Sequence, residues 1–116
     1  MIRLPIKLTA VTSHSRYALV AELTTALNEL GSVLDSQQFS NLALAIHFEI
    51  SARNMPNLRP ALMALPMSLS NSSLEALDSL ENAESEELPS EIAGSLNITF
   101  VHNEPDFRMH IPAVPG

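Results

Sequence analysis

A ten-residue stretch, 42–51, alternates between two kinds of side chain, and this pattern restricts the fold more than any other in the chain. One set is large and apolar: Leu42, Leu44, Ile46, Phe48 and Ile50. The other set is small or polar: Ala43, Ala45, His47, Glu49 and Ser51. A period of two is typical of a β-strand with two different faces. The stretch therefore predicts a sheet covered by helices on one face, with the other face open or used as a contact surface.

A helix is predicted over 16–30, because its apolar residues recur at the spacing of a single stripe: Leu19, Val20, Leu23, Ala26, Leu27 and Leu30. We expect Leu27 to be buried against the strand 42–51. Ser13 or Ser15 can accept hydrogen bonds from the first turn of this helix. Gly31 is expected to end it in the left-handed conformation.

The other elements of residues 1–70 are shorter or weaker. Strands are predicted over 2–11, with regular pairing after Pro5, over 32–39 as an edge strand, and over 67–70. A second helix is predicted over 58–65, with Asn57 as its cap. This order is strand–helix–strand–strand–helix–strand. It predicts an α+β, ferredoxin-like unit, an antiparallel sheet with two helices on one face.

Residues 71–116 are expected to form a C-terminal extension packed on the same domain. Ser72 and Glu75 have the spacing of a capping box that opens a third helix, and 96–102 is a β-branched, alternating strand. The segment that follows is rich in proline. Because strand backbone groups need partners, we expect 96–102 to pair beside 67–70 or in the sheet of a neighbouring subunit. The second possibility leads us to predict a homodimer.

Composition narrows the functional class. The chain has 116 residues, 46% of them hydrophobic, and a formal net charge of −7, which predicts one globular domain and argues against nucleic acid as a partner. No lysine or arginine lies between Arg59 and Arg108. No apolar run is long enough to span a bilayer, so we expect no membrane partner. With no cysteine and no secretory pattern at the start, we expect a cytoplasmic location.

The stretch His14-Ser-Arg-Tyr-Ala-Leu-Val-Ala21 resembles the Asp-Arg-Pro-Gly-Leu-Val-Ala pattern of the ACT family of regulatory domains. The stretch 30–35 is similar to the Gly-x-Asn-Ile region that opens the second strand of that family. The closest likeness is to the stand-alone and tandem domains related to the glycine-cleavage repressor. Four residues agree with the pattern: Arg16, Leu19, Val20 and Ala21. Three depart from it: Ser15 stands for Asp, Tyr17 for Pro and Ala18 for Gly.

The resemblance implies an oligomeric domain that binds a small amino-acid-like ligand between the first turn and a neighbouring subunit. The predicted ligand site contains Ser13, His14, Ser15, Arg16, Tyr17, Ala18, Asp35 and Gln37. Arg16 and the first-turn N–H groups can hold a carboxylate, and Asp35 and Gln37 can receive an amino group. The alternative is that the serines only cap the helix, Arg16 is solvated, and Asp35 and Gln37 decorate an edge strand.

The sequence gives weaker support for a metal site or for a catalytic site. One group of side chains could hold a divalent metal, although its spacing matches no known metal loop: His102, Glu104, Asp106 and His110. No nucleophile elbow is present for Ser/His/Asp catalysis. We therefore expect no cofactor and no enzymatic activity. The sequence favours a regulatory domain that oligomerises and binds a ligand, with an assembly module that binds no small molecule as the alternative.

Overall fold

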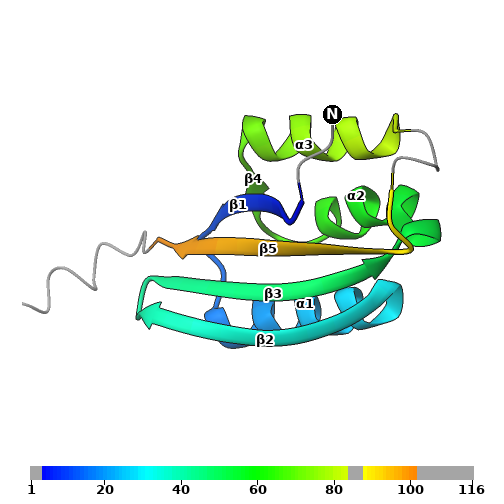
Figure 1. Ribbon diagram of the computed structural model, residues 1–116. Coiled ribbons are helices and arrows are strands. Elements are labelled where there is room, and N and C mark those ends of the chain that lie inside the picture. Colours follow the sequence, from blue (N-terminus) through cyan, green and yellow to red (C-terminus); the bar gives the residue numbers. More distant parts are fainter. Residues whose placement is uncertain (1–3, 84–87, 102–116) are drawn as a thin grey trace, which may run out of the picture.

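The computed structural model describes residues 4–83 and 88–101, which form an α+β structure with one five-stranded sheet and three α-helices (Figure 1). A short 3-10 turn at Ala52–Asn54 leads into α2. The elements follow one another as β1 (Ile6–Thr12), α1 (Arg16–Leu30), β2 (Gly31–Ser40), β3 (Ala43–Ser51), α2 (Met55–Met63), β4 (Ser68–Leu69), α3 (Asn71–Glu81) and β5 (Glu91–Phe100).

The strand order is β2-β3-β5-β1-β4. β5 lies inside the sheet, parallel to β1 on one side and antiparallel to β3 on the other. The sheet is therefore mixed, and the antiparallel ferredoxin-like order expected for residues 1–70 is not confirmed. Nor does the strand predicted at 96–102 pair at the outside or with a neighbour. It supplies a central position in its own subunit because it buries an apolar side under the helices: Ile92, Leu96, Ile98 and Phe100.

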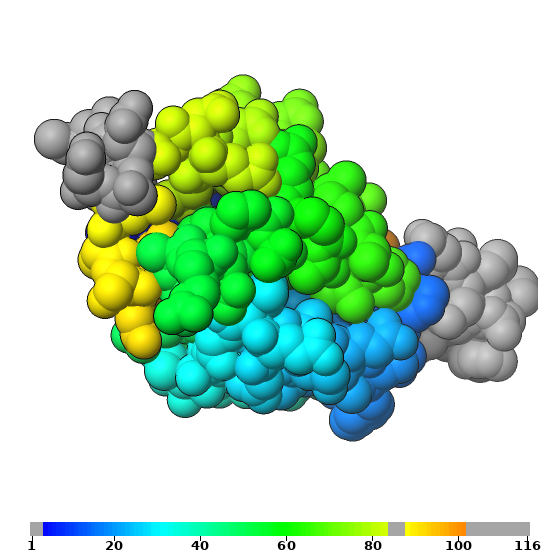
Figure 2. Space-filling model, turned by 90° about the vertical axis from the view of Figure 1, so that its right-hand side faces the viewer, coloured from blue at the N-terminus to red at the C-terminus, as the bar shows by residue number. Residues whose placement is uncertain are grey.

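The helices cover one face of this sheet. α2 contacts both α1 and α3, and the space-filling view shows their surfaces side by side, with the green α2 segment between the blue and yellow-green ones (Figure 2). An ion pair between Arg59 and Asp78 links α2 to α3. Leu19, Leu23 and Leu27 of α1 are fully buried, which confirms the predicted orientation of this helix. No helix among the described residues is long and apolar enough to cross a bilayer.

Gly31 does not adopt the predicted left-handed conformation. Its φ of −176° is that of an extended residue, and the chain passes directly from α1 into β2, where Gly31 pairs with Ile50. A Cβ atom at Gly31 would collide with the backbone oxygen of Glu49. Glycine is therefore required here by the close approach of two strands rather than by a helix-ending turn.

Two other element boundaries differ from the prediction. α2 begins at Met55, three residues before the expected start, and contains Pro60 in its interior. α3 is capped by Ser70 rather than Ser72, because the Ser70 hydroxyl accepts a hydrogen bond from the Ser73 N–H at 3.2 Å.

The two edges of the sheet differ in how far other elements cover them. Beyond the two-residue β4, the outer edge of β1 is met by α3. The Thr9 N–H donates to the Ser73 hydroxyl at 2.7 Å, and the Ser70 N–H donates to the Thr9 carbonyl at 3.0 Å. β2 forms the opposite edge and is mostly exposed. Its pairing with β3 is interrupted by bulges between Val33 and Asp35 and between Gln38 and Ser40.

Candidate functional site

The turn between β1 and α1 is held from inside by Thr12, a residue that the sequence analysis did not single out. The Thr12 side chain is buried, donates to the Pro66 carbonyl at 2.6 Å, and accepts from the His14 N–H at 3.0 Å. Ser13, His14 and Ser15 are exposed beyond it. Ser15 is the N-cap of α1, yet its hydroxyl makes no capping hydrogen bond, contrary to the predicted role. The positive end of the helix is therefore open to solvent.

The Arg16 side chain contacts two groups of the same subunit near this turn. One guanidinium nitrogen donates to the Asn41 carbonyl at 3.3 Å, in the hairpin between β2 and β3. The guanidinium carbon lies 5.3 Å from the centre of the Tyr17 ring, a cation–π distance. Tyr17 and Ala18 are exposed on the first turn of α1. Six of the eight predicted ligand residues therefore lie together, with Arg16 turned toward the hairpin and Tyr17.

Asp35 and Gln37 are not part of this group. Asp35 pairs with His47, and Gln37 pairs with Ala45, on the side of the sheet away from the helices. The bulge at Leu34 explains their position. Val33 points toward the core, and regular alternation would place Asp35 and Gln37 on that same face, but one inserted residue turns both to the opposite face.

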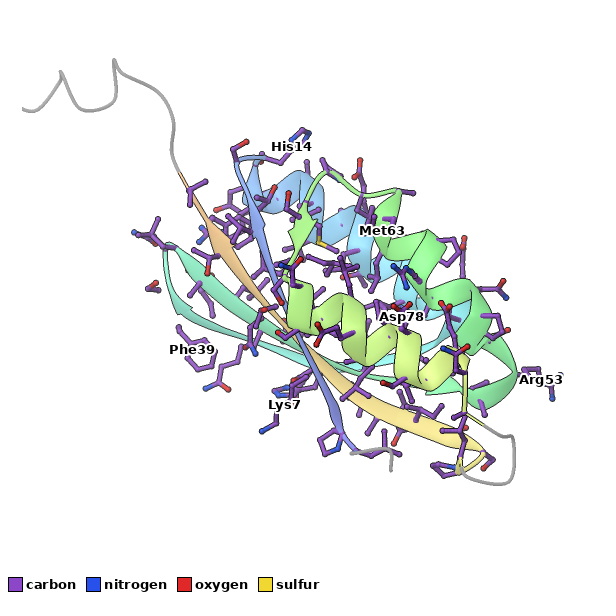
Figure 3. All side chains as sticks on the ribbon, turned by 90° about the horizontal axis from the view of Figure 1, so that it is seen from above. Lys7, His14, Phe39, Arg53, Met63 and Asp78 are labelled. Atoms are coloured by element: carbon purple, nitrogen blue, oxygen red, sulfur yellow. The ribbon has the colours of Figure 1, made fainter. Side chains whose placement is uncertain are left out.

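The side of the sheet without helices carries the more ordered arrangement. Registers across β1, β5, β3 and β2 place its side chains in rows, which we call the helix-free face. Toward the ends of β1 and β2 these rows are Thr9–Asn97–Ala45–Gln37 and Val11–Thr99–Ala43–Ser40. The row nearer the start of β1 is Lys7–Ser95–His47–Asp35, which we call the charged row. Figure 3 shows Lys7 and Phe39 pointing away from the helices on this face.

The charged row is organised by a contact between its last two members. The His47 Nδ1 atom lies 2.6 Å from an Asp35 carboxylate oxygen, and both side chains are partly exposed. Ser95 is the next residue along the row, so Asp, His and Ser occupy three adjacent strands. Ser95 belongs to a central strand paired on both sides, and the N–H groups around it are engaged in the sheet. They are not free to stabilise an oxyanion, which a serine nucleophile needs.

The exposure of side chains differs between the strands of the helix-free face. Ala45 is only 3% exposed, although it points away from the helices. By contrast, Val11 on β1 is 47% exposed, and Phe39 on β2 is 61% exposed. Phe39 occupies the second bulge, so it shares a position opposite Ala43 with Ser40. Near the hairpin, the face thus has alanines on β3 and larger exposed apolar residues on the flanking strands β1 and β2.

A carboxyl pair lies at the other end of this face. Glu49 pairs with Ala93 of β5, and Glu91 lies diagonally across on the same side. A hydrogen bond with the Glu91 side chain raises the pKa of Glu49 above its usual value of 4.5, with smaller contributions from desolvation and charge repulsion. Glu49 therefore takes up a proton more readily than an isolated glutamate does.

Sequence reasoning identified part of this face and missed part of it. It placed Ala43, Ala45, His47, Glu49 and Ser51 opposite the apolar side of β3; the burial pattern agrees at four of these positions, and Ala45 is buried as well. It did not find the alignment of Lys7 and Asp35, because strand order is not written in any local pattern. The possible metal ligands at 102–110 lie outside the described residues. Within those residues there is no cluster of three or more metal-ligating side chains.

Comparisons of the chain with protein-family models, with curated proteins and with solved structures find no match, so function has to be inferred from these surfaces.

Proposed function

We propose that the protein is a non-enzymatic assembly domain that binds another protein subunit through its helix-free face. The observation that carries the proposal is the composition of this face. In the two rows nearest the hairpin, β3 and β5 present uncharged side chains, two of them alanines, above a packed core, while Val11 and Phe39 stand exposed on the flanking strands β1 and β2. Short side chains of this kind let a second flat surface approach closely.

The distribution of charge on the helix-free face favours a contact with another protein over simple exposure to water. A solvent-exposed sheet face usually carries polar residues with long side chains along all its strands. Here the two rows nearest the hairpin contain no charged residue, and Phe39 and Val11 are exposed beside them. Depletion of charge with exposed aromatic and aliphatic groups is typical of the core of a protein interface.

The test places a long charged side chain on the centre of the face. Asn97→Arg changes an exposed residue of β5 in the same row as Ala45. Asn57→Arg makes the same change on an exposed position of α2 and serves as the matched control. The molecular size of the full chain is measured in two settings. In one, the labelled chain is added to an extract of its source cells; in the other, the purified chain is kept at high concentration. We expect Asn97→Arg to reduce that size toward the 12.6 kDa monomer and Asn57→Arg to leave it unchanged.

If Asn97→Arg and the unmodified chain have the same size in both settings, the face is not an interaction surface. A uniform loss of association in both variants would also contradict the proposal, because it would show that position on the molecule does not matter. Far-ultraviolet circular dichroism checks that each variant retains its fold.

A second candidate function follows from the open N-terminus of α1. A carboxylate could bind at this turn, as the resemblance to ACT domains predicts. The Ser13–Ser15 turn is exposed, the Ser15 side chain makes no capping hydrogen bond, and Arg16 is adjacent. We therefore retain a small amino-acid-like ligand as a prediction, without Asp35 and Gln37. A thermal-shift screen over free amino acids tests it, since a ligand that binds the native state raises Tm. Arg16→Ala should remove that rise and leave Tm without ligand nearly unchanged.

A further inference from the structure

We propose that the subunit bound on the helix-free face is a second copy of this chain, packed face to face about a two-fold axis parallel to the strands. This inference rests on the proposed function and names the partner. Its basis is that the charged row and the two uncharged rows match their own counterparts in this one orientation, while the Glu49–Glu91 pair lies beyond the charged row, at the end of the face away from the hairpin.

The charged row shows the complementarity of charge. Lys7 stands on β1 at one end of the row, and Asp35 stands on β2 at the other, three strands away. An axis parallel to the strands, passing between β3 and β5, places β1 of each subunit over β2 of the other. Lys7 then faces Asp35 of the partner subunit, and the reciprocal pair forms on the other side of the axis.

The apolar residues follow the same operation. Val11 lies two rows beyond Lys7 on β1, and Phe39 lies at the corresponding height on β2, in the bulge opposite Ala43. The same axis therefore brings Val11 against Phe39 of the partner subunit. At the centre, Ala45 meets Asn97 of the partner subunit, so small groups oppose each other where the sheets are closest. Sheets packed in this way are about 10 Å apart.

Other symmetric arrangements lack this match. A two-fold axis along the charged row would place Lys7 opposite Lys7 and Asp35 opposite Asp35, which is repulsive. An edge-to-edge dimer through β2 would need a regular ladder, but the bulges at Leu34 and Phe39 interrupt that edge.

The size of the face agrees with a reversible dimer. With strands about 4.8 Å apart and residues on one face about 6.6 Å apart along each strand, the three rows cover roughly 400 Å² of each subunit. The total of about 800 Å² lies below the range of about 1,200–2,000 Å² of stable interfaces, and at this size association is weak. The expected species is thus a monomer–dimer equilibrium that depends on concentration.

Charge reversal in the purified full chain tests the orientation. Lys7→Glu creates two repulsive pairs with Asp35, and Asp35→Lys creates two with Lys7. Each variant alone should raise the dimer dissociation constant by about tenfold or more. An equimolar mixture of the two variants forms a heterodimer in which both pairs are again attractive. Sedimentation equilibrium should therefore show association in the mixture close to that of the original chain.

The mixture separates this proposal from a folding defect and from the proposed function. Two variants that fail to fold would not recover on mixing. If the original chain stays monomeric at high micromolar concentration while Asn97→Arg still reduces its size in the extract, the partner is a different protein and the self-association proposal is wrong. If the chain dimerises but the mixture shows no recovery, the orientation about the strand-parallel axis is wrong.

Discussion

The contact between Gly31 and β3 predicts a specific cost for adding one methyl group. In Gly31→Ala, the new Cβ would collide with the backbone oxygen of Glu49 and lie 2.8 Å from the Ile50 Cα atom. These are backbone atoms, so the start of β2 must move away from β3. Losing one or two ladder hydrogen bonds costs about 0.5–1.5 kcal/mol each, and strain adds to it. Replacing glycine returns about 0.5–1 kcal/mol through the unfolded chain. We expect a net destabilisation of about 1–3 kcal/mol.

Urea unfolding followed by circular dichroism measures this free energy directly. Ser32→Ala is the matched control, because Ser32 is the exposed neighbour of Gly31 in the same strand. The control should change the free energy of unfolding by less than about 0.5 kcal/mol. If Gly31→Ala were as stable as the original chain or more stable, the close approach of β2 to β3 at Glu49 would be wrong.

Three further predictions concern the core, the carboxyl pair and the turn. Leu27→Ala should cost about 2–5 kcal/mol in urea unfolding, since Leu27 is fully buried, and a cost below about 0.5 kcal/mol would contradict the packing of α1. Because the folded-state pKa of Glu49 is raised, its contribution favours folding at low pH and is lost as pH rises above 4.5. Glu49→Gln should therefore be more stable at pH 7 than the original chain, with a smaller difference at pH 4; equal effects at both pH values would refute the raised pKa of Glu49. Thr12→Val should cost about 1–3 kcal/mol by leaving the Pro66 carbonyl unpaired, whereas Thr12→Ser should retain most of the stability.

Local patterns predicted the elements that depend on side-chain periodicity. The stripe of α1 and the alternation of β3 depend only on residues close in sequence, and both match the observed burial. The start of β1 at Ile6, after Pro5, follows from the missing N–H of proline. These are the parts of the fold that a short stretch of chain determines by itself.

The position of β5 and the faces of β2 could not be predicted in this way. The stretch 96–102 was recognisable as a strand, but its place between β1 and β3 depends on which strands leave a gap in the sheet. In β2, one bulge at Leu34 reverses the side on which Asp35 lies, and polar edge strands carry little pattern to reveal it. This bulge separates Asp35 and Gln37 from the other six residues of the predicted ligand site. The charged row, in contrast, is made of residues that are far apart in the sequence.

The most direct test of the helix-free face as an interface is a contact between Phe39 and Val11 of different subunits. Within one subunit these residues lie on strands about 14 Å apart, too far for a nuclear Overhauser effect. In a mixture of isotope-labelled and unlabelled chains, a filtered experiment detects only contacts between subunits. We predict intermolecular signals from the Phe39 ring to the Val11 methyl groups. Signals between Val11 methyl groups of the two subunits, or a concentrated sample with no intermolecular signal on this face, would contradict the account.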